Sequence, residues 1–598
     1  MKKITGILGF FFALVGAVLG SDGDGSGYRQ RLREVLELRA KAVDVRDYKA
    51  GGLAAIEAKL ALRQDAEWCS RRLIELMREP TGDMFWMFPC VAIANLGDEQ
   101  LSLEAKQALR EAWKNYMPMR GDTENHWLMY YASLFLMAER WPNEPGDRWF
   151  NGKSSDENHA EAESYLRHWI EITTERGQGE YDCTHYIAEY CIPLIELATW
   201  SRDPEMKKLA AMMLDYIFAD FAVDTLDGVY AGAHARTDDT QVLEKWNGMS
   251  SYFAWAFFDN CPRPRRNEDF QTHFSAVAYG SPYVMPDVIR RIALDRSRPY
   301  AQREVKRFPA PKRGPRQQEV PVYKQTYMTR DYAVGSDQGG GLGPIQHHSW
   351  DVTWAVSDPR GVHNTIFSTH PHVSIDELQM YFAEYPDALG VTITQQNKPT
   401  YLSPDKLIGS SLYEQVFQNQ DCVIALYDIP AGTEFGHVSG FFSKDLARVE
   451  EDRSGWIFAQ GGNVYIAYRS LAPYEWSPLP AGGRRLHSPH LKNGTVIQVA
   501  SATEFSSWEK FKDAIRALEF SQALEPVPSV RFRTLRGHLI EAVYGQGPRL
   551  DGEAVDFSRW KLFDGPYLQA ELGSRRLEIR HGKEVRVLDF DKISIEQK

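Results

Sequence analysis

Helical periodicity dominates the first half of the sequence. Apolar and aromatic residues recur three, four and seven positions apart, as at Tyr165, Trp169 and Ile172, and this spacing places them on one face of a helix. Pro204 directly follows Asp203, which suits the first turn of a helix. The pattern predicts helices over residues 28–62, 66–77, 103–116, 124–141, 159–175, 184–201, 204–221, 250–258 and 286–293.

Beyond about residue 318 the pattern changes to short apolar and β-branched runs. Turn signals separate them, such as Asn-Gly at 493–494, Gly-Gly at 461–462 and His-Gly at 581–582. Strands are predicted over 320–329, 332–335, 349–356, 365–367, 391–395, 421–427, 457–459, 463–468, 495–502, 530–534, 538–542, 567–572 and 576–581, with one helix over 505–518. So many short strands indicate an antiparallel sandwich.

The change of pattern divides the chain into two domains. We predict a helical domain over residues 26–300, a linker rich in Pro, Arg and Gln over 301–318, and an antiparallel β-sandwich over 319–598. Many helices joined by short turns fit either a ring of helix hairpins or a solenoid. Because the sequence has no repeat of fixed period, we favour the ring, an (α/α) toroid or incomplete barrel.

Residues 1–20 have the three parts of a secretory signal peptide. Lys2 and Lys3 precede an apolar stretch over 4–19, and a polar run over 21–25 follows. The apolar stretch is short for a membrane span, so cleavage is favoured over a membrane anchor. We expect a periplasmic or secreted protein without membrane attachment, acting as a monomer or homodimer.

Composition limits the partners that this protein can bind. The formal net charge of −12 argues against nucleic acid, yet a local cationic cleft could still bind an acidic polysaccharide. Aromatic residues make up 12% of the chain, and Trp and Tyr suit sugar rings. Six cysteines are too few for a disulfide framework, although Cys183 and Cys191 are close enough in sequence to pair.

The segment Asp-Thr-Glu-Asn-His-Trp over residues 122–127 is the first candidate for chemistry. Asp122 or Thr123 can cap the following helix, which places Asn125 and His126 in its first turn. Free N–H groups there, with an Asn-His pair, can bind a substrate carboxylate. The alternative is an ordinary capping loop.

A second polar segment lies between two predicted helices, over residues 176–186. Its two glycines permit an unusual backbone, and ionisable residues crowd behind them. The alternative is a well-capped connector. The candidate functional residues of this segment and of the next helical turn are Arg176, Glu180, Tyr181, His185, Tyr186 and Tyr190.

The third candidate segment covers residues 228–236 and also follows a long helix. Small residues here allow a ligand to approach closely, and Tyr230, His234 and Arg236 are the candidate side chains. Arg236 would suit a carboxylate through bidentate hydrogen bonds. An ordinary surface loop is the alternative.

In a helical toroid such loops line one end of a cleft, and together these three carry what β-elimination from a uronate needs. Asn, His, Arg or protonated Glu would neutralise the carboxylate next to the acidic C5 proton. A Tyr or His would take this proton, and a Tyr would protonate the leaving oxygen at C4. A Tyr acting as base needs a lowered pKa, which Arg176 or Arg236 could provide.

The layout resembles the toroid-plus-sandwich polysaccharide lyases, which include alginate lyases, heparinase II/III-like enzymes and chondroitin lyases. Asn125-His126 is similar to their paired Asn and His, and the Gly-x-Gly-Glu-Tyr segment at 177–181 is similar to that of alginate or glucuronan lyases. The segment at 346–351, Gln-His-His-Ser-Trp-Asp, resembles the sandwich entry of heparinase-like proteins. The glycine-rich run over 339–343 before it is expected to form a mobile loop over the toroid cleft, which would bring His347 or His348 to the site. The resemblance implies a catalytic Tyr, either Tyr181 or Tyr186.

The sequence thus predicts a secreted lyase acting on a uronic-acid polysaccharide such as alginate, glucuronan or a glycosaminoglycan. His126, Tyr181 and Tyr186 are the expected catalytic residues, and the other candidates bind substrate. No cofactor is required, although a structural divalent cation at His363, His370 and His372 stays open. One alternative is a glycoside hydrolase using a carboxylate pair from Glu124, Glu180, Asp182 and Asp238. The other is a non-catalytic glycan-binding protein.

Overall fold

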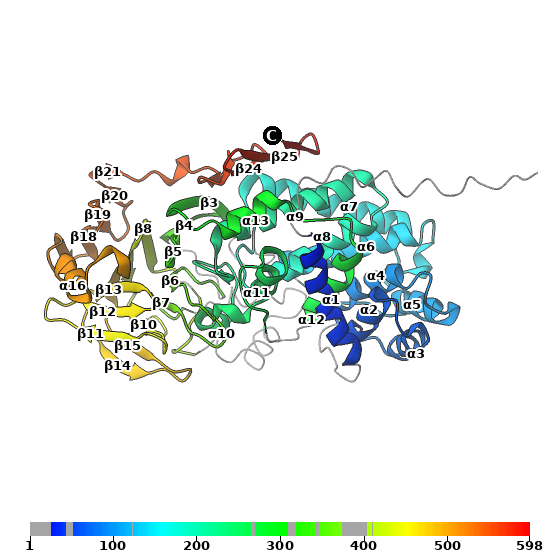
Figure 1. Ribbon diagram of the computed structural model, residues 1–598, viewed down its shortest axis with the longest axis horizontal. Coiled ribbons are helices and arrows are strands. Elements are labelled where there is room, and N and C mark those ends of the chain that lie inside the picture. Colours follow the sequence, from blue (N-terminus) through cyan, green and yellow to red (C-terminus); the bar gives the residue numbers. More distant parts are fainter. Residues whose placement is uncertain are drawn as a thin grey trace, which may run out of the picture.

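The computed structural model describes residues 25–42, 52–121, 123–264, 269–308, 319–340, 346–372, 403–409 and 411–598. The predicted signal peptide, residues 341–343 of the predicted glycine-rich loop and the predicted strand over 391–395 lie outside these ranges. Helices make up the first half of the chain and antiparallel strands the second (Figure 1), which confirms the predicted fold class.

Five helices form a closed ring in which each packs against the next and the last packs against the first. In ring order they are α2 (Ala54–Ala61), α4 (Met84–Leu96), α6 (Glu124–Arg140), α8 (Ile187–Trp200) and α12 (Asp269–Gly280). The helices that pack against this ring or against one another are α1 (Gly25–Lys41), α3 (Ala66–Leu76), α5 (Leu103–Asn115), α7 (Ser155–Arg176), α9 (Pro204–Asp224) and α13 (Asp287–Leu294). This arrangement is the predicted helical toroid.

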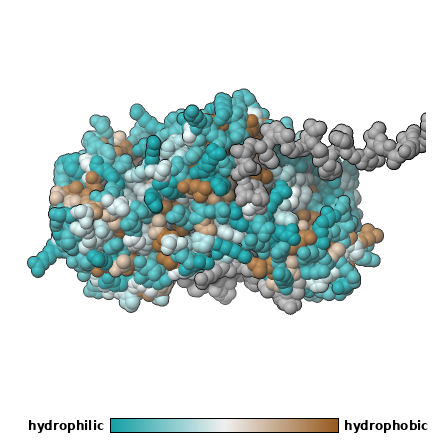
Figure 2. All heavy atoms as spheres, viewed as in Figure 1, coloured by the Kyte–Doolittle hydropathy of each residue, from teal (hydrophilic) through white to brown (hydrophobic). Residues whose placement is uncertain are grey.

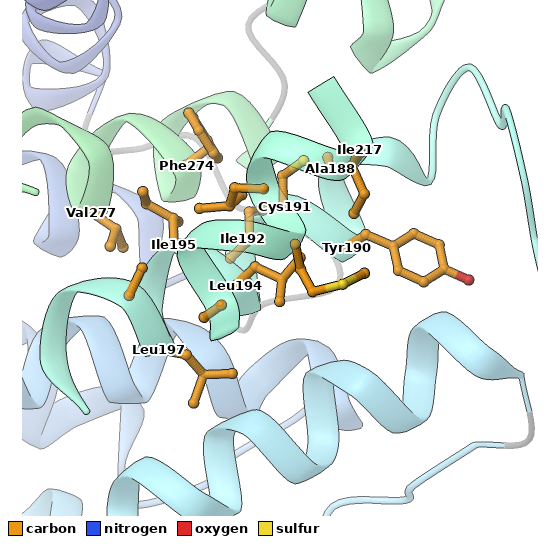
Figure 3. Close-up of a cluster of buried hydrophobic side chains, with 14 of the residues drawn as sticks. Ala188, Tyr190, Cys191, Ile192, Leu194, Ile195, Leu197, Ile217, Phe274 and Val277 are labelled. Carbon is orange, nitrogen blue, oxygen red and sulfur yellow. The ribbon is translucent and has the colours of Figure 1, made fainter. Parts of the chain in front are cut away.

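The ring helices are buried on all sides, which explains why sequence periodicity missed two of them. Helix α4 buries every residue from 84 to 94, so it has no polar face and no helical period. Helix α8 is similar: Figure 3 shows Phe274 and Val277 of α12 on one side of it and the Tyr190 ring on the other. Helices α4 and α12 were therefore absent from the prediction.

Two predicted helices have different bounds. The predicted helix over 28–62 corresponds to two helices, α1 and α2, with residues 43–51 between them outside the description. The one over 250–258 is the short helix α11 (Met249–Phe253) followed by a π-turn at Ala254–Phe258.

Two antiparallel sheets face each other in the second half of the chain. The first runs β3 (Tyr300–Phe308), β4 (Val320–Met328), β5 (Tyr332–Gly340), β6 (Trp350–Trp354), β7 (Thr365–Thr369), β10 (Val438–Phe442), β15 (Arg484–Ser488) and β14 (Glu475–Pro478). The second runs β8 (Glu414–Asn419), β9 (Cys422–Asp428), β16 (Lys492–Ser501), β13 (Val464–Ser470), β12 (Ile457–Gly461) and β11 (Arg448–Glu451). One apolar core joins residues of both sheets, so this is a sandwich.

The remaining elements cover the far side of the second sheet and return to the toroid. Helix α16 (Trp508–Arg516) and a small sheet of five strands over residues 520–554 share a core with the second sheet. Strands β24 (Arg576–His581) and β25 (Glu584–Asp589) then pack against α13, as Figure 1 shows at the top of the molecule. The Arg586 guanidinium donates to Asp215 of α9 at 2.6 Å.

The predicted linker over 301–318 is wrong in its first part. Residues 301–308 belong to strand β3, and 309–318 lie outside the description. Two basic residues of this first part, Lys306 and Arg307, are buried and pair with carboxylates of the helical domain. The Asn-Gly pair at 493–494 is also no turn, because it lies within β16.

The surface and the cysteines add two further facts. On the face in Figure 2 hydrophilic residues predominate and hydrophobic ones occur in small scattered groups. Cys183 and Cys191 are separate buried thiols. Within the described residues, no helix combines the length and apolarity that a membrane crossing requires.

Candidate active site

The first turns of four ring helices meet at one end of the ring. The ring centroid of Phe85 (α4) lies 5.6 Å from that of His126 (α6) and 5.7 Å from that of Phe270 (α12). His185, just before α8, lies 5.4 Å from Phe270 and 6.1 Å from Tyr186. We call these five residues the ring mouth. His126, His185 and Tyr186 are only half-buried, so three predicted site residues come together where solvent can reach them.

Glycines hold the loops at the ring mouth in place. Gly121 has a φ of +71°, and a Cβ there would overlap the His126 ring. A Cβ on Gly179 would overlap the Glu124 carboxylate. Larger residues at either position would displace the side chains beside the ring mouth.

Beneath the ring mouth, the buried Glu180 carboxylate contacts several of the residues that the sequence predicted for the site. It accepts hydrogen bonds from the Asn125 backbone N–H at 2.8 Å, from the Asn125 amide and from the Tyr190 hydroxyl at 3.3 Å. It also forms an ion pair with Arg236. Asn125 and Arg236, predicted to bind a substrate carboxylate, therefore both bind a carboxylate of the protein itself.

Arg236 also connects this buried carboxylate to the ring mouth. Its Nη2 donates to the Tyr186 hydroxyl at 3.1 Å, and its guanidinium lies 4.6 Å from the centre of the Tyr186 ring. Its Nε donates to Gln346 Oε1 at 2.9 Å. Burial raises the pKa of Tyr186 well above its usual value, and Arg236 offsets this only in part. Tyr186 is therefore protonated at neutral pH.

A second buried ion pair joins the sandwich to the helical domain. Arg307 of β3 pairs with Glu124 and donates from Nε to the Gly177 carbonyl at 2.9 Å. Glu124 in turn accepts from the Tyr190 hydroxyl at 2.9 Å and from the Glu180 N–H at 3.1 Å. The sequence prediction missed Arg307, because nothing in a strand sequence shows that its arginine reaches into another domain.

Tyr181 faces the sandwich and is fully buried. Its hydroxyl donates to Asp337 Oδ2 at 2.6 Å and lies 3.4 Å from His347 Nε2, which itself pairs with Asp337. Burial and the Asp337 charge raise the pKa of Tyr181 well above its usual value. The expected net lowering of a tyrosine pKa is wrong for both residues, because burial outweighs Arg236 at Tyr186 and the Asp337 charge adds to burial at Tyr181. Arg176, the other arginine expected to lower a tyrosine pKa, has a side chain that is 65% exposed, and its Nη1 lies 3.7 Å from Glu319 Oε2.

The third predicted segment supplies buried contacts rather than open side chains. The Tyr230 hydroxyl donates to Asp182 Oδ1 at 2.7 Å, and Lys306 and Lys324 lower the pKa of Asp182 although burial opposes this. His234 Nδ1 lies 2.6 Å from the Asp182 carbonyl. Burial, with the charges of nearby basic groups, lowers the pKa of His234 well below its usual value, so this imidazole is neutral.

The predicted cation site at three histidines does not assemble as a ligand set. Among the described residues, the group whose ligand atoms lie within 4.8 Å of one another is Asp182, Asp224 and Glu304. Lys306 and Lys324 already pair with these carboxylates, so their negative charge is largely neutralised within the protein.

Comparison with known proteins adds little at the level of sequence. No protein-family model matches the chain, and no curated protein matches its sequence. Among solved structures, the heparan sulfate lyase HepC from Pedobacter heparinus is similar over 88% of this chain and 90% of that chain, with 9% identity and a TM-score of 0.24. A likeness this remote assigns neither a family nor a site.

Proposed function

We propose that this protein is a polysaccharide lyase that cleaves a uronic-acid-containing polysaccharide by β-elimination at the ring mouth. The observation that carries the proposal is the state of the Tyr186 hydroxyl. This half-buried group accepts a hydrogen bond from Arg236, and within the described residues it donates to no acceptor. Its proton is therefore available to a substrate oxygen, beside two half-buried imidazoles.

The proposed reaction assigns one role to each half-buried side chain of the ring mouth. The His126 imidazole takes the C5 proton of the uronate, while His185 binds the carboxylate whose negative charge grows as that proton leaves. The C4–O bond breaks as the C4–C5 double bond forms, and the leaving oxygen takes the Tyr186 proton. Arg236, 3.1 Å from the Tyr186 oxygen, then stabilises the phenolate until a proton returns from water.

Tyr186 fits the role of acid better than Tyr181 does. Tyr181 is fully buried and already donates its proton to Asp337, whereas Tyr186 is half-buried and has no such acceptor in the part of the chain that the structure describes. Its raised pKa keeps the hydroxyl protonated at neutral pH, as an acid must be before the reaction and a base must not. Asn125, Glu180 and Arg236 act as positioning residues, because they hold the Tyr186 and His126 segments together from below.

Three of the four candidate carboxylates of the hydrolase alternative, all except Asp238, do not suit that reaction. Hydrolysis needs one protonated carboxyl group and one free carboxylate on either side of the scissile bond. Glu124 and Glu180 are both buried or nearly so and each forms an ion pair with an arginine. Asp182 is fully buried between two lysines, with its pKa below its usual value.

One assay tests the proposal against both alternatives. The protein is incubated with alginate, glucuronan, heparan sulfate and chondroitin sulfate, and the ultraviolet absorbance of unsaturated uronate is followed together with reducing ends. Increase of both signals on one of these polymers supports the lyase. Reducing ends without the absorbance indicate a hydrolase, and binding without either signal indicates a glycan-binding protein; both results contradict the proposal.

Removing the reactive group of His126 or of Tyr186 should abolish turnover without unfolding the protein. For His126→Ala and Tyr186→Phe we expect initial rates to fall at least about 100-fold, because general acid and base groups contribute about that much. His159→Ala is the matched control: His159 is also half-buried, but it lies near Phe135 and Glu139 at the other end of α6. Rates within about threefold of wild type in either test variant would exclude the assigned roles.

A further inference from the structure

A cleft of about 630 Å³ lies where the helical domain meets the sandwich, and we call it the interdomain cleft. The helical domain contributes Asp227, in a tight turn after helix α9, and residues 294–297 at the end of α13 and beyond it. The sandwich contributes residues 330–331 of the β4–β5 turn and residues 355–357 after β6. The cleft is open to solvent, and none of the ring-mouth residues lines it. Its volume is within the range of small-molecule sites, which is about 300–1,000 Å³.

Two of the three carboxylates that line the interdomain cleft are occupied by hydrogen bonds within the protein. Asp295 Oδ1 accepts from the hydroxyl group two residues further along the chain at 2.6 Å, and its Oδ2 accepts from the Tyr567 hydroxyl at 3.0 Å. Asp331 accepts from the Asn463 amide at 3.0 Å through one oxygen and from the Ser501 hydroxyl through the other. Because these bonds join distant segments of the chain, both carboxylates support the walls of the cleft.

The third carboxylate, Asp227, and the Arg330 guanidinium are charged groups of the cleft that have no partner in the protein. Both residues are exposed, and neither side chain forms a hydrogen bond or an ion pair with any residue that the structure describes. They come from different domains and line the same cleft without pairing with each other. A ligand in the cleft can therefore contact an unused acceptor and an unused donor at once.

Arg296 contributes a positive charge whose position is fixed by the backbone. Its Nη1 donates to the Ile292 carbonyl at 3.0 Å, and its Nη2 donates to the Thr225 carbonyl. No carboxylate of the described residues forms an ion pair with this guanidinium, and its buried Nε has no hydrogen-bond partner among them. The charge of Arg296 is therefore not neutralised by a direct contact within the protein.

Apolar side chains lie beside these polar groups. Leu294 is 41% exposed, and Ala355 and Val356 are half-buried. All three line the interdomain cleft. A ligand that combines polar groups with C–H surface therefore matches the cleft better than one that is polar or apolar throughout.

The charges that line the cleft are nearly balanced, with three carboxylates and two guanidinium groups. An anion would lie beside the unpaired Asp227, and a cation would lie beside Arg296 and Arg330. Like charges at such short range are unfavourable, so either ligand would lose part of what it gains from the opposite charge. The lining thus favours a ligand without net charge that can both donate and accept hydrogen bonds.

We propose that the interdomain cleft binds a neutral sugar unit. Sugar hydroxyl groups donate to the Asp227 carboxylate and accept from the Arg330 guanidinium, so one ring serves both unpaired side chains. The C–H face of the ring packs against Leu294 and Val356. This site binds sugar without acting on it, and it stands whether or not the ring mouth is catalytic.

Titrations of the whole chain, followed by saturation-transfer NMR, test the site directly. The probes are the neutral sugars N-acetylglucosamine, galactose and lactose, with sodium glucuronate and glucosamine hydrochloride as charged controls, at neutral pH and constant ionic strength. We expect at least one neutral sugar to bind, and to bind more tightly than either charged control. Arg330→Met and Asp227→Asn should each weaken this binding at least about tenfold, because each removes or weakens hydrogen bonds to a charged group.

Three further variants locate the bound sugar. Arg453→Met is the matched control, since Arg453 is also an exposed arginine without a described partner in a turn of the sandwich, between β11 and β12, but lies outside the cleft. It should bind as the wild type does. Ser357→Trp fills the cleft without removing a charged group and should weaken binding at least about tenfold. His126→Ala should keep the binding, because the ring mouth takes no part in it.

The site would be overturned if no neutral sugar bound, or if a charged control bound more tightly than every neutral sugar. Unchanged binding in Arg330→Met, Asp227→Asn or Ser357→Trp would also overturn it, and loss of binding in His126→Ala would place the sugar at the ring mouth instead. Because the measurement needs no turnover, it separates this proposal from the lyase. Cleavage of a polysaccharide without binding in the cleft would remove this site alone, and binding in the cleft without cleavage would remove the lyase alone.

Discussion

The ring mouth differs from the domain junction beneath it, by which we mean the buried ion pairs Glu180–Arg236 and Glu124–Arg307. The difference lies in whether the polar groups have hydrogen-bond partners within the protein. At the junction, Glu180 pairs with Arg236 and Glu124 with Arg307, and both carboxylates accept further hydrogen bonds. At the ring mouth, the Tyr186 hydroxyl keeps its proton free of a described acceptor. Under the proposed function, proximity to the site is therefore not enough to make a residue the catalytic group. What distinguishes one is unused bonding capacity at a place that a substrate can reach.

Breaking a junction pair should produce the largest effect on stability. Arg236→Met leaves the buried Glu180 carboxylate without its counter-ion, and we expect a loss of about 3–5 kcal/mol in the free energy of unfolding. Urea denaturation measures this loss. In the double variant with Glu180→Gln, part of it should be recovered, because the orphaned charge is gone. A single variant within about 1 kcal/mol of wild type would show that the pair is not the main support of this junction.

Lys406 is 2% exposed, and its Nζ has no hydrogen-bond partner among the described residues, so removing its ammonium group should increase stability. Its folded pKa of about 7 lies below the value of about 10.4 in an unfolded chain, so between these values the unfolded chain binds more protons. Lys406→Met should therefore be more stable than wild type by about 4 kcal/mol at pH 7.

This advantage should shrink as the pH rises from 7 to 10, where the unfolded lysine loses its proton as well. Denaturant midpoints of the two proteins across this range measure it. Lys512→Met serves as the control, since Lys512 pairs with Glu450 at 3.0 Å and should give no such gain. A destabilised Lys406→Met at pH 7 would show that the ammonium has a partner in the folded chain.

The order of domains could be predicted from the sequence because it depends on local periodicity. Amphipathic helices such as α3 and α5 show that periodicity, whereas α4 does not, since its environment is apolar on every side. Residues 301–308 were assigned to a linker from the Pro, Arg and Gln content of 301–318, whereas they form strand β3, whose Lys306 pairs with a carboxylate that only the folded chain brings near.

The sequence predicted which segments form the candidate site, but it could not predict the role of each residue within them. Asn125 and His126 are adjacent in the sequence, yet Asn125 points into the protein toward Glu180 and His126 lies half-buried at the ring mouth. A helix turns about 100° per residue, so neighbours in the first turn face different surroundings. The roles of Tyr181 and Tyr186 separate for a similar reason, because one contacts the sandwich and the other a toroid arginine.

Two substitutions that each remove one hydroxyl group, Tyr181→Phe and Tyr186→Phe, should have the smallest effects on stability. They also give the sharpest test of the difference between buried, paired groups and the ring mouth. Tyr181→Phe deletes the hydrogen bond to the buried Asp337 carboxylate and should cost about 1–2 kcal/mol, whereas Tyr186→Phe should cost less than about 1 kcal/mol. Turnover should show the reverse order, with the larger loss in Tyr186→Phe. Urea denaturation and initial rates on the cleaved polymer measure both quantities in the same preparations. If Tyr181→Phe lost more activity than Tyr186→Phe while remaining as stable as wild type, the buried tyrosine would be the proton donor and the ring mouth would lose its assigned acid.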